Sequence, residues 1–328
     1  MAQEPSRLTV LDGWRGVSIL AVLAGHLLPL GPKILQLNAA TATFGMAVFF
    51  TLSGFLITRF LLKNDDVVVF VIRRVCRIVP LAWLYMVVAL LLFSWKPDDL
   101  LAQLFFYANW PPMQLTDITG HLWSLCVEVQ FYVGIAALVL FGGRRAIYLL
   151  PLLCLAVTAF RVWNGVHIAI NTYFRVDEIL AGAVLAILYE RNLTTGFRRT
   201  PLIVVVPLLY ASCHPASEWL NYLRPYLAAA TVGATIYQPS SMLSKRLGSR
   251  VLRYIAEVSY ALYVIHPLLG ATWLGSGDKI VKYLKRPLLF AALFALAHIS
   301  TFYYERRWIA LGKSYSSRRP RPAVAEPE

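Results

Sequence analysis

The sequence predicts an all-α polytopic membrane protein with about ten transmembrane helices, and three observations lead to this fold class. Of its 328 residues, 58% are hydrophobic and only 15% are charged, and the mean hydropathy is +0.60. Apolar stretches that approach the length of a membrane span recur along the whole chain. Backbone polar groups in lipid must find hydrogen bonds within their own segment, so such stretches are expected to be helices.

Ten apolar segments are expected to form these helices, in chain order. Their approximate ranges are 14–30, 40–62, 80–95, 121–141, 147–162, 173–190, 201–213, 225–238, 254–273 and 286–305. The clearest apolar runs are Val17–Leu30, Met46–Leu62, Leu81–Phe93 and Phe131–Phe141. These runs lie in the first four expected helices, and the remaining ranges follow the same apolar pattern.

The basic residues between these segments predict the orientation in the membrane. With the N-terminus inside, the cytoplasmic segments and span ends would hold 21 lysines and arginines and the external ones 8. Both termini are therefore expected in the cytoplasm, with residues 1–313 as a single transmembrane domain and 314–328 as a disordered cytoplasmic tail. This bias explains the excess of 31 Lys and Arg over 17 Asp and Glu, so no nucleic-acid partner is predicted.

The four cysteines do not form a recognisable pattern. Cys76, Cys126, Cys154 and Cys213 are far apart, and three of them lie within or beside apolar runs. Neither a disulfide framework nor a metal site is predicted from such spacing.

Ionisable side chains within the predicted spans are candidates for a functional cavity, because they are costly in lipid. Arg15 and His26 are eleven residues apart on the first helix, so they are expected on one face and in one cavity. His121, Glu128 and Tyr132 form a stripe on the fourth helix. His26 and Glu128 are predicted to lie at similar depths below the outer membrane surface, so their side chains are expected to be able to meet. A core histidine and a structural ion pair of Glu128 with an arginine remain alternatives.

Two further segments place polar residues in the same predicted layer. Arg175 and Asp177 begin the sixth helix, while Tyr260, Tyr263 and His266 lie in the outer half of the ninth. Convergence of four helices on one layer predicts a polar pocket, which is the default hypothesis for a functional site. The two tyrosines also fit an interfacial aromatic belt.

The segment after the second helix carries three arginines that would share one face of a short helix. Arg73, Arg74 and Arg77 suit a polyphosphate such as that of coenzyme A, because each guanidinium can bind phosphate oxygens bidentately. Anchoring to lipid headgroups is the alternative. In the second helix, Gly54 would allow a close helix approach or a local break, and Ser53 could donate a hydrogen bond into the cavity.

Six sequence motifs, in order over about 255 residues, resemble acyltransferase family 3 of membrane O-acyltransferases. The matching segments are Leu11-Asp-Gly-Trp-Arg15 with His26, Phe49-Phe-x-Leu-Ser-Gly-Phe55, Arg73-Arg-x-x-Arg77-Ile-x-Pro80, Trp123-Ser-Leu-x-x-Glu128-x-Gln-Phe-Tyr132, Phe174-Arg-x-Asp177 and Ser259-Tyr-x-Leu-Tyr-x-x-His266-Pro267. The resemblance implies an acyltransferase that moves an acyl group, expected to be acetyl, from cytoplasmic acyl-CoA to a hydroxyl. The implied acceptor is a sugar, an envelope glycan or a glycosylated natural product.

The resemblance also implies roles for particular residues. The family's essential histidine falls on His26 and its paired arginine on Arg15, and the donor-associated arginines fall on Arg73, Arg74 and Arg77. The co-substrate would be acetyl-CoA or another acyl-CoA, without a metal, in the cytoplasmic membrane of a bacterium.

The predicted mechanism makes His26 the general base on the acceptor hydroxyl. Glu128 would orient it, and Arg15 or Ser53 would stabilise the oxyanion. An acyl-imidazole on His26 is the competing mechanism. Ser53 is also assigned to donor binding.

The acceptor residues are expected to be Asp177, Arg175, Tyr132, His121, Tyr263 and His266. The lipid bilayer is a partner, and an oligomer is compatible with the sequence. A transporter or flippase that uses the same polar residues is the main alternative function, followed by a different polytopic transferase and a non-catalytic scaffold.

Overall fold

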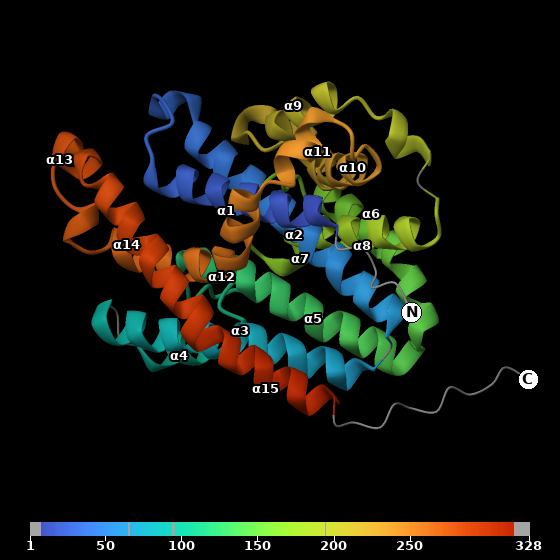
Figure 1. Ribbon diagram of the computed structural model, residues 1–328, viewed down its shortest axis with the longest axis horizontal. Coiled ribbons are helices and arrows are strands. Elements are labelled where there is room, and N and C mark those ends of the chain that lie inside the picture. The colour runs from blue at the N-terminus through green and yellow to red at the C-terminus, as the bar shows by residue number, and fades with distance from the viewer. Residues whose placement is uncertain (1–7, 65, 94–95, 194, 318–328) are drawn as a thin grey trace, which may run out of the picture.

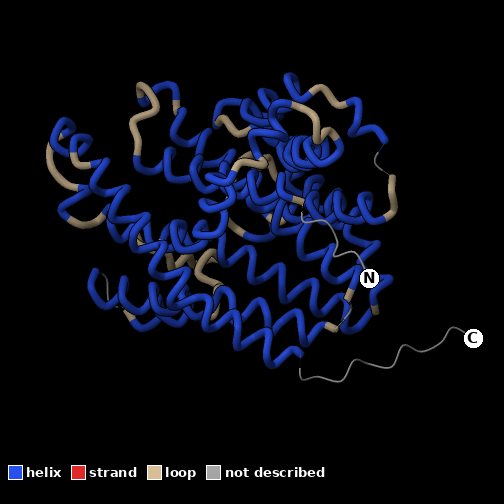
Figure 2. Tube along the Cα trace, viewed as in Figure 1, coloured by secondary structure: helices blue, strands red, loops and turns tan. Residues whose placement is uncertain are grey.

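The computed structural model describes residues 8–64, 66–93, 96–193 and 195–317, and within these ranges the protein is all-helical (Figures 1 and 2). No strand occurs in the described ranges. The all-α class is therefore confirmed.

Helices lie at all ten expected positions. In the first half they are α1 (Thr9–Leu27), α2 (Leu37–Lys63), α3 (Val67–Phe93), α4 (Pro97–Leu104), α5 (Trp123–Gly142) and α6 (Leu150–Trp163). In the second half they are α7 (Thr172–Arg175), α8 (Asp177–Glu190), α9 (Leu202–Ser212), α10 (Arg224–Tyr237), α11 (Met242–Leu247), α12 (Arg250–Gly270), α13 (Lys279–Leu284), α14 (Arg286–Ile299) and α15 (Arg306–Ser317). A π-helical turn, Ser300–Glu305, joins α14 to α15.

Six helical segments in the described chain are long and apolar enough to cross a membrane. They are Thr9–Leu27, Lys33–Lys63, Val67–Phe93, Gly120–Gly142, Arg144–Trp163 and Arg286–Ser316. The chain is accordingly an integral membrane protein. Ten spans are not confirmed, because α8 and α10 have 14 residues each and α9 has 11. At about 1.5 Å per residue these helices are shorter than a hydrocarbon core of about 30 Å.

The centre of the bundle is formed by α1, α2, α8 and α12, which make the most extensive helix contacts. Helices α2 and α8 cross at two glycines. A Cβ on Gly54 would lie 1.8 Å from the carbonyl oxygen of Ile179, and one on Gly182 would lie 2.0 Å from that of Thr51. Since α2 continues unbroken through this point, Gly54 serves a close helix approach, one of its two predicted roles.

The arginine motif lies inside a long helix, which corrects its expected position in a loop with a short helix. Helix α3 begins before Arg73 and continues through Pro80. Two tyrosine hydroxyls from neighbouring helices donate to carbonyls beside the proline: Tyr260 to Ile78 at 2.6 Å and Tyr304 to Pro80 at 3.3 Å. These contacts tie α3 to α12 and to the π-helical turn near the proline.

The start of α1 and the end of α15 lie at the same end of the bundle. Helix α15 runs beside α3 (Figure 1), and the Nε of Arg73 donates to the Oγ of Ser316 at 3.1 Å. Residues 314–317, which the sequence analysis assigned to the tail, complete α15. Residues 318–328 of the expected tail lie outside the described residues.

Candidate active site

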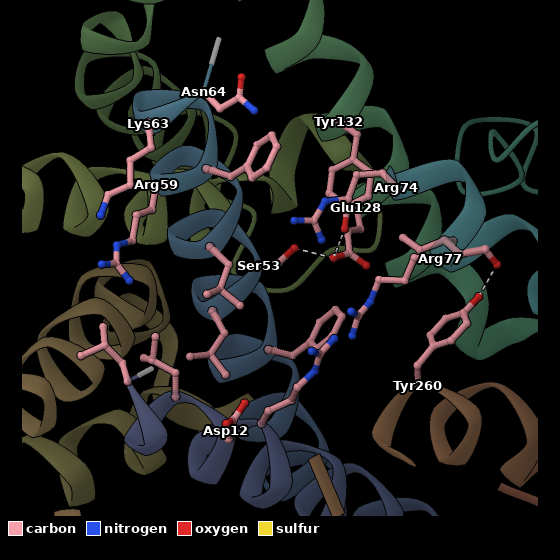
Figure 3. A pocket seen from close by; sticks show the side chains of 18 residues that line it. Asp12, Ser53, Arg59, Lys63, Asn64, Arg74, Arg77, Glu128, Tyr132 and Tyr260 are labelled. Carbon is pink, nitrogen blue, oxygen red and sulfur yellow. Dashed lines mark hydrogen bonds between the residues drawn. The ribbon is translucent and has the colours of Figure 1, made fainter. Parts of the chain in front are cut away.

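A cavity of about 570 Å³ lies between α1, α2, α3, α5 and α12 (Figure 3). We call it the arginine cavity. Its charged and hydroxyl-bearing lining residues are Asp12, Arg15, Ser53, Arg59, Lys63, Arg74, Arg77, Glu128, Tyr132 and Tyr260. It brings together residues of all five helices, and it lies at the end of the bundle where α1 begins.

Glu128 is the buried carboxylate of this cavity, with 6% of its surface exposed. The hydroxyls of Ser53 and Tyr132 both donate to its Oε1 (Figure 3). Ser53 belongs to α2 and Tyr132 to α5, so this carboxylate ties two helices together. Buried charged groups need such partners, and here hydroxyls supply them.

Arg15, Arg74 and Arg77 surround Glu128 without forming an ion pair with any described carboxylate. The guanidinium of Arg74 lies 5.7 Å from the ring centre of Tyr132. All three are half-buried. Guanidiniums remain charged at any physiological pH, so the cavity carries positive charge that its own carboxylates do not neutralise.

Arg59 and Lys63 extend this positive charge along α2, and the sequence analysis did not select them. Both contact Oε1 of Glu190, at 2.7 Å from the Nε of Arg59 and 3.4 Å from the Nζ of Lys63. Their four-residue spacing on the helix that carries Ser53 was the signal available in the sequence.

Arg73 diverges from its two neighbours. It is exposed and does not line the arginine cavity. It joins Arg74, Arg77 and Lys313 around an adjoining space of about 200 Å³. The expected common face of three arginines is therefore shared between two neighbouring spaces.

A second cavity, of about 590 Å³, lies at the other end of α1. We call it the histidine cavity, because His26, His121 and His266 line it together with Asp117, Lys282 and Arg286. His26 is exposed, whereas His121 and His266 have 9% and 2% of their surfaces exposed. The exposed imidazole of His26 therefore lies beside two buried imidazoles, those of His121 and His266.

The hydrogen bonds assign the tautomers of His26 and His266. The Nδ1 of His266 lies 2.7 Å from the carbonyl oxygen of Tyr263, and a carbonyl only accepts, so this Nδ1 carries the proton. The Nε2 of a neutral His266 then accepts from the Nδ1–H of His26 at 2.9 Å. His26 is left with an unprotonated Nε2 that can take a proton from a hydroxyl.

A packed layer separates the two cavities. The Tyr263 hydroxyl donates to the carbonyl oxygen of His121 and lies 2.5 Å from the Oγ of Ser124. The Nε2 of His121 in turn lies 3.2 Å from the carbonyl oxygen of Val264. A space of only about 30 Å³, lined by residues that include Arg15, Glu128 and Tyr263, occupies the middle.

Two expected arrangements therefore need correction. Arg15 and His26 line different cavities. Glu128 bonds Ser53 and Tyr132, and the residue that contacts His26 is His266. Arg15 and His26 both lie on α1, but eleven residues, or about 16 Å along the helix axis, separate them.

The predicted acceptor residues Arg175 and Asp177 lie in a buried ion-pair network, away from the lining of both cavities. The Nη1 of Arg161 is 2.5 Å from Oδ2 of Asp177, and the Nη2 of Arg175 is 3.4 Å from Oε2 of Glu178. The Nε of Arg224 donates to Oε1 of Glu178. The sequence analysis did not select Arg161, Glu178 or Arg224 as site candidates and so missed this network.

The other predicted acceptor residues divide between the two regions. Tyr132 lines the arginine cavity, His121 and His266 line the histidine cavity, and Tyr263 lies in the layer between them. The described residues contain no group of three or more His, Cys, Asp or Glu side chains arranged to hold a metal.

The comparison with known proteins identifies a family and several similar bacterial proteins. The model of a family described as "Acyltransferase domain" matches residues 8–306. Peptidoglycan O-acetyltransferase OatA of Listeria monocytogenes is 26% identical over 321 residues, covering 80% of this chain and 49% of OatA. YrhL of Bacillus subtilis, named as a candidate peptidoglycan O-acetyltransferase, is 28% identical over 315 residues, covering 78% and 47%.

A Staphylococcus aureus protein named as a candidate O-acetyltransferase is 27% identical over 309 residues, covering 78% of this chain and 49% of that protein. The chain thus spans about half the length of the curated relatives that it matches. No solved structure matches it.

Proposed function

This chain belongs to the acyltransferase domain family, and from that premise we propose that it is an O-acetyltransferase that moves an acetyl group from acetyl-CoA to a hydroxyl of an envelope glycan. The observation that carries the proposal is the placement of a cationic cavity and an imidazole-lined cavity at opposite ends of the same helices. The relatives named for peptidoglycan support a glycan acceptor.

The arginine cavity is the proposed donor site. Arg74 and Arg77 would bind phosphate oxygens of coenzyme A, with Arg59 and Lys63 nearby on α2. Arg73 and Lys313 border the adjoining space, which suits a second phosphate group. Arg15 and Ser53 lie deeper along the path toward the middle of the bundle.

The histidine cavity is the proposed acceptor site. The free Nε2 of His26 is the base that receives the hydroxyl proton, and His266 orients it through the Nδ1–Nε2 hydrogen bond of 2.9 Å. The imidazole of His266 thereby takes the orienting role that a carboxylate fills in a catalytic triad. Its own Nδ1 is held by the Tyr263 carbonyl.

The proposed reaction is a single acyl transfer. As His26 takes the proton, the acceptor oxygen attacks the thioester carbonyl and the new ester C–O bond forms. The C–S bond then breaks, and the coenzyme A thiolate takes the proton from the His26 imidazolium, which restores the neutral base. For this step the thioester must pass the layer around Tyr263 and Ser124, so the side chains there must separate.

An acyl-imidazole at His26 would use the same residues in two steps. The Nε2 of His26 would first attack the thioester carbonyl and expel coenzyme A as its thiolate. The acceptor hydroxyl would then attack the acyl-imidazolium, which breaks the C–N bond and restores neutral His26, while the thiolate takes the hydroxyl proton. If a labelled acyl-enzyme can be trapped with the wild type but not with His26→Ala, the acyl-imidazole mechanism is favoured over direct attack.

We further propose that the protein resides in the cytoplasmic membrane with both termini and the arginine cavity facing the cytoplasm. Acetyl-CoA is a cytoplasmic metabolite, and its phosphates cannot enter a bilayer without a charged site. The histidine cavity would then face the outside, where envelope glycans lie.

The decisive experiment uses purified protein with acetyl-CoA and glycan acceptors, and follows O-acetylated product by mass spectrometry. His26→Ala should lower the rate about 10²- to 10⁴-fold, the typical contribution of a general base. His298→Gln is the matched control, because His298 is exposed and contacts Tyr254 outside both cavities. Acetyl transfer that survives in His26→Ala would refute the assignment.

A further inference from the structure

Arg286 is a buried cation that forms no ion pair with a carboxylate in the described part of the chain. It is the first residue of α14, has 6% of its surface exposed and lines the histidine cavity. Its Nε and Nη1 have no hydrogen-bond partner among the described residues. Its described contact is with the ring of Tyr283, whose centre lies 5.7 Å from its Cζ. Buried charged donors are rarely left unsatisfied, so this guanidinium indicates a ligand.

Lys282 supplies a second positive charge to the same cavity. It lies on α13, four residues before Arg286, is half-buried and lines the cavity. Neighbouring Lys285 differs, because its Nζ donates to the carbonyl oxygens of Trp273 and Ser276 at 3.0 and 3.4 Å. Lys285 therefore stabilises the local backbone, whereas Lys282 forms no hydrogen bond or ion pair with a described residue.

The carboxylates near these cations do not neutralise them. Asp278 caps α13 by accepting from the backbone N–H of Val281 at 2.8 Å. Asp117 lines the cavity, is exposed and forms no ion pair with Arg286 or Lys282. A carboxylate in that setting suits the hydroxyl groups of a sugar, to which it can only accept hydrogen bonds.

The space available fits a saccharide that carries an anionic group. The histidine cavity measures about 590 Å³, and a neighbouring space of about 700 Å³ shares Asp117, Pro267 and Gly270 with it. Pockets for small molecules usually measure about 300–1,000 Å³. Sugar rings would fill this volume and leave one charged substituent for the two cations.

Resting on the proposed function, we propose that Arg286 and Lys282 form an anion subsite in the histidine cavity, so that the acceptor is a saccharide bearing a carboxylate or phosphate. The anion anchors the acceptor at α13 and α14 while a hydroxyl of the same saccharide faces His26. This subsite sets which glycans are acetylated and takes no part in the proton transfer.

A pair of saccharides that differ in one charge tests the subsite. The probes are a disaccharide containing N-acetylmuramic acid with its carboxylate free, and the same disaccharide with that group as a methylamide. Binding is measured by titration of purified full-length protein in nanodiscs of phosphatidylcholine. The wild type should bind the free acid about 10- to 100-fold more tightly, as expected for hydrogen bonds to a charged group.

Arg286→Gln should abolish this preference, and Lys282→Gln should reduce it. Lys282 is half-buried, so its replacement provides a second test if Arg286→Gln lowers the yield of folded protein. Lys279→Gln is the matched control, because Lys279 belongs to the same short helix, is exposed and does not line the cavity. Equal binding of both probes by the wild type, or a preference that persists in both variants, would overturn the subsite.

Nanodiscs with added phosphatidylglycerol test the lipid as the source of the anion. If this lipid abolishes binding of the free acid, a headgroup occupies the subsite and the acceptor role is overturned. Acetyl transfer from acetyl-CoA, measured separately on both probes, tests the proposed function. A charge-dependent binding preference without any transfer would refute that function and leave the anion subsite standing.

Discussion

Two clusters of buried charge in this protein are built differently. In the buried ion-pair network of α6, α7, α8 and α10, each carboxylate faces guanidinium nitrogens, as in the pairs Arg161–Asp177 and Arg224–Glu178. In the arginine cavity, Arg74 and Arg77 face space, and the carboxylate of Glu128 is bonded by hydroxyls. Charge that is neutralised internally stabilises the fold, whereas charge that is left open is available to a ligand.

This difference predicts which substitutions unfold the protein and which only weaken binding. In the network, removing one charge leaves its partner buried and uncompensated. In the cavity, removing one charge relieves repulsion among like charges. The two regions meet where α2 crosses α8, so a change at that crossing should affect both.

The largest expected effect is the loss of Glu178 from the network. Glu178→Gln should lower the free energy of unfolding by about 3–5 kcal/mol, because Arg224 and Arg175 lose their shared carboxylate in a buried site. Thermal unfolding in detergent, followed by size-exclusion chromatography, measures this. The control is Glu257→Gln, which breaks the exposed pair with Arg306 and should cost about 0–1 kcal/mol. Similar losses in both variants would contradict the structural role of the network.

The next effect is expected at the crossing of α2 and α8. Gly54→Ala should destabilise the protein by about 1–3 kcal/mol, since the new methyl group would overlap the carbonyl of Ile179 unless the helices move apart. Because Ser53 precedes it and bonds Glu128, acetyl-CoA turnover should fall as well. Gly134→Ala on α5 is the control, because a Cβ there meets nothing within 4 Å. Unchanged stability in Gly54→Ala would show that the close approach is not needed.

A substitution in the arginine cavity should separate binding from stability. Arg77→Gln should weaken acetyl-CoA binding about 10- to 100-fold, through loss of a charge-assisted hydrogen bond to phosphate. The melting temperature should stay near that of the wild type. Arg250→Gln is the control, because Arg250 is exposed and outside the cavity. Titration with acetyl-CoA measures the binding, and loss of folded protein in Arg77→Gln would place this arginine with the structural charges.

The smallest expected effect is at Lys63. Its side chain is 46% exposed and already contacts Glu190 at 3.4 Å, so Lys63→Gln should raise the KM for acetyl-CoA only about two- to fivefold. Arg59 keeps its own contact with Glu190 at 2.7 Å. Steady-state kinetics measures the change, and an effect as large as that of Arg77→Gln would show that the phosphate group binds nearer to α2 than proposed.

Much of the fold and of the residue set could be predicted before the structure. Each of the ten apolar ranges contains a helix, because exclusion of water from lipid allows few other backbone conformations. Two of the three arginines that were expected to share a face, Arg74 and Arg77, line one cavity. The expected helix 80–95 began at Pro80, yet α3 runs from Val67 through this proline, because tertiary packing can override a local helix-breaking preference.

The composition and the apolar pattern by themselves determined the membrane class and the helical segments, and the spacing of polar residues selected the side chains proposed for the site. Helical periodicity also predicted that Arg15 and His26 share one face of the first helix. Only the tertiary structure decided that His26 contacts His266 while Glu128 contacts Ser53 and Tyr132. The reason is physical: the rotation and depth of each helix follow from packing contacts such as those of Gly54 and Gly182, which join residues far apart in the chain.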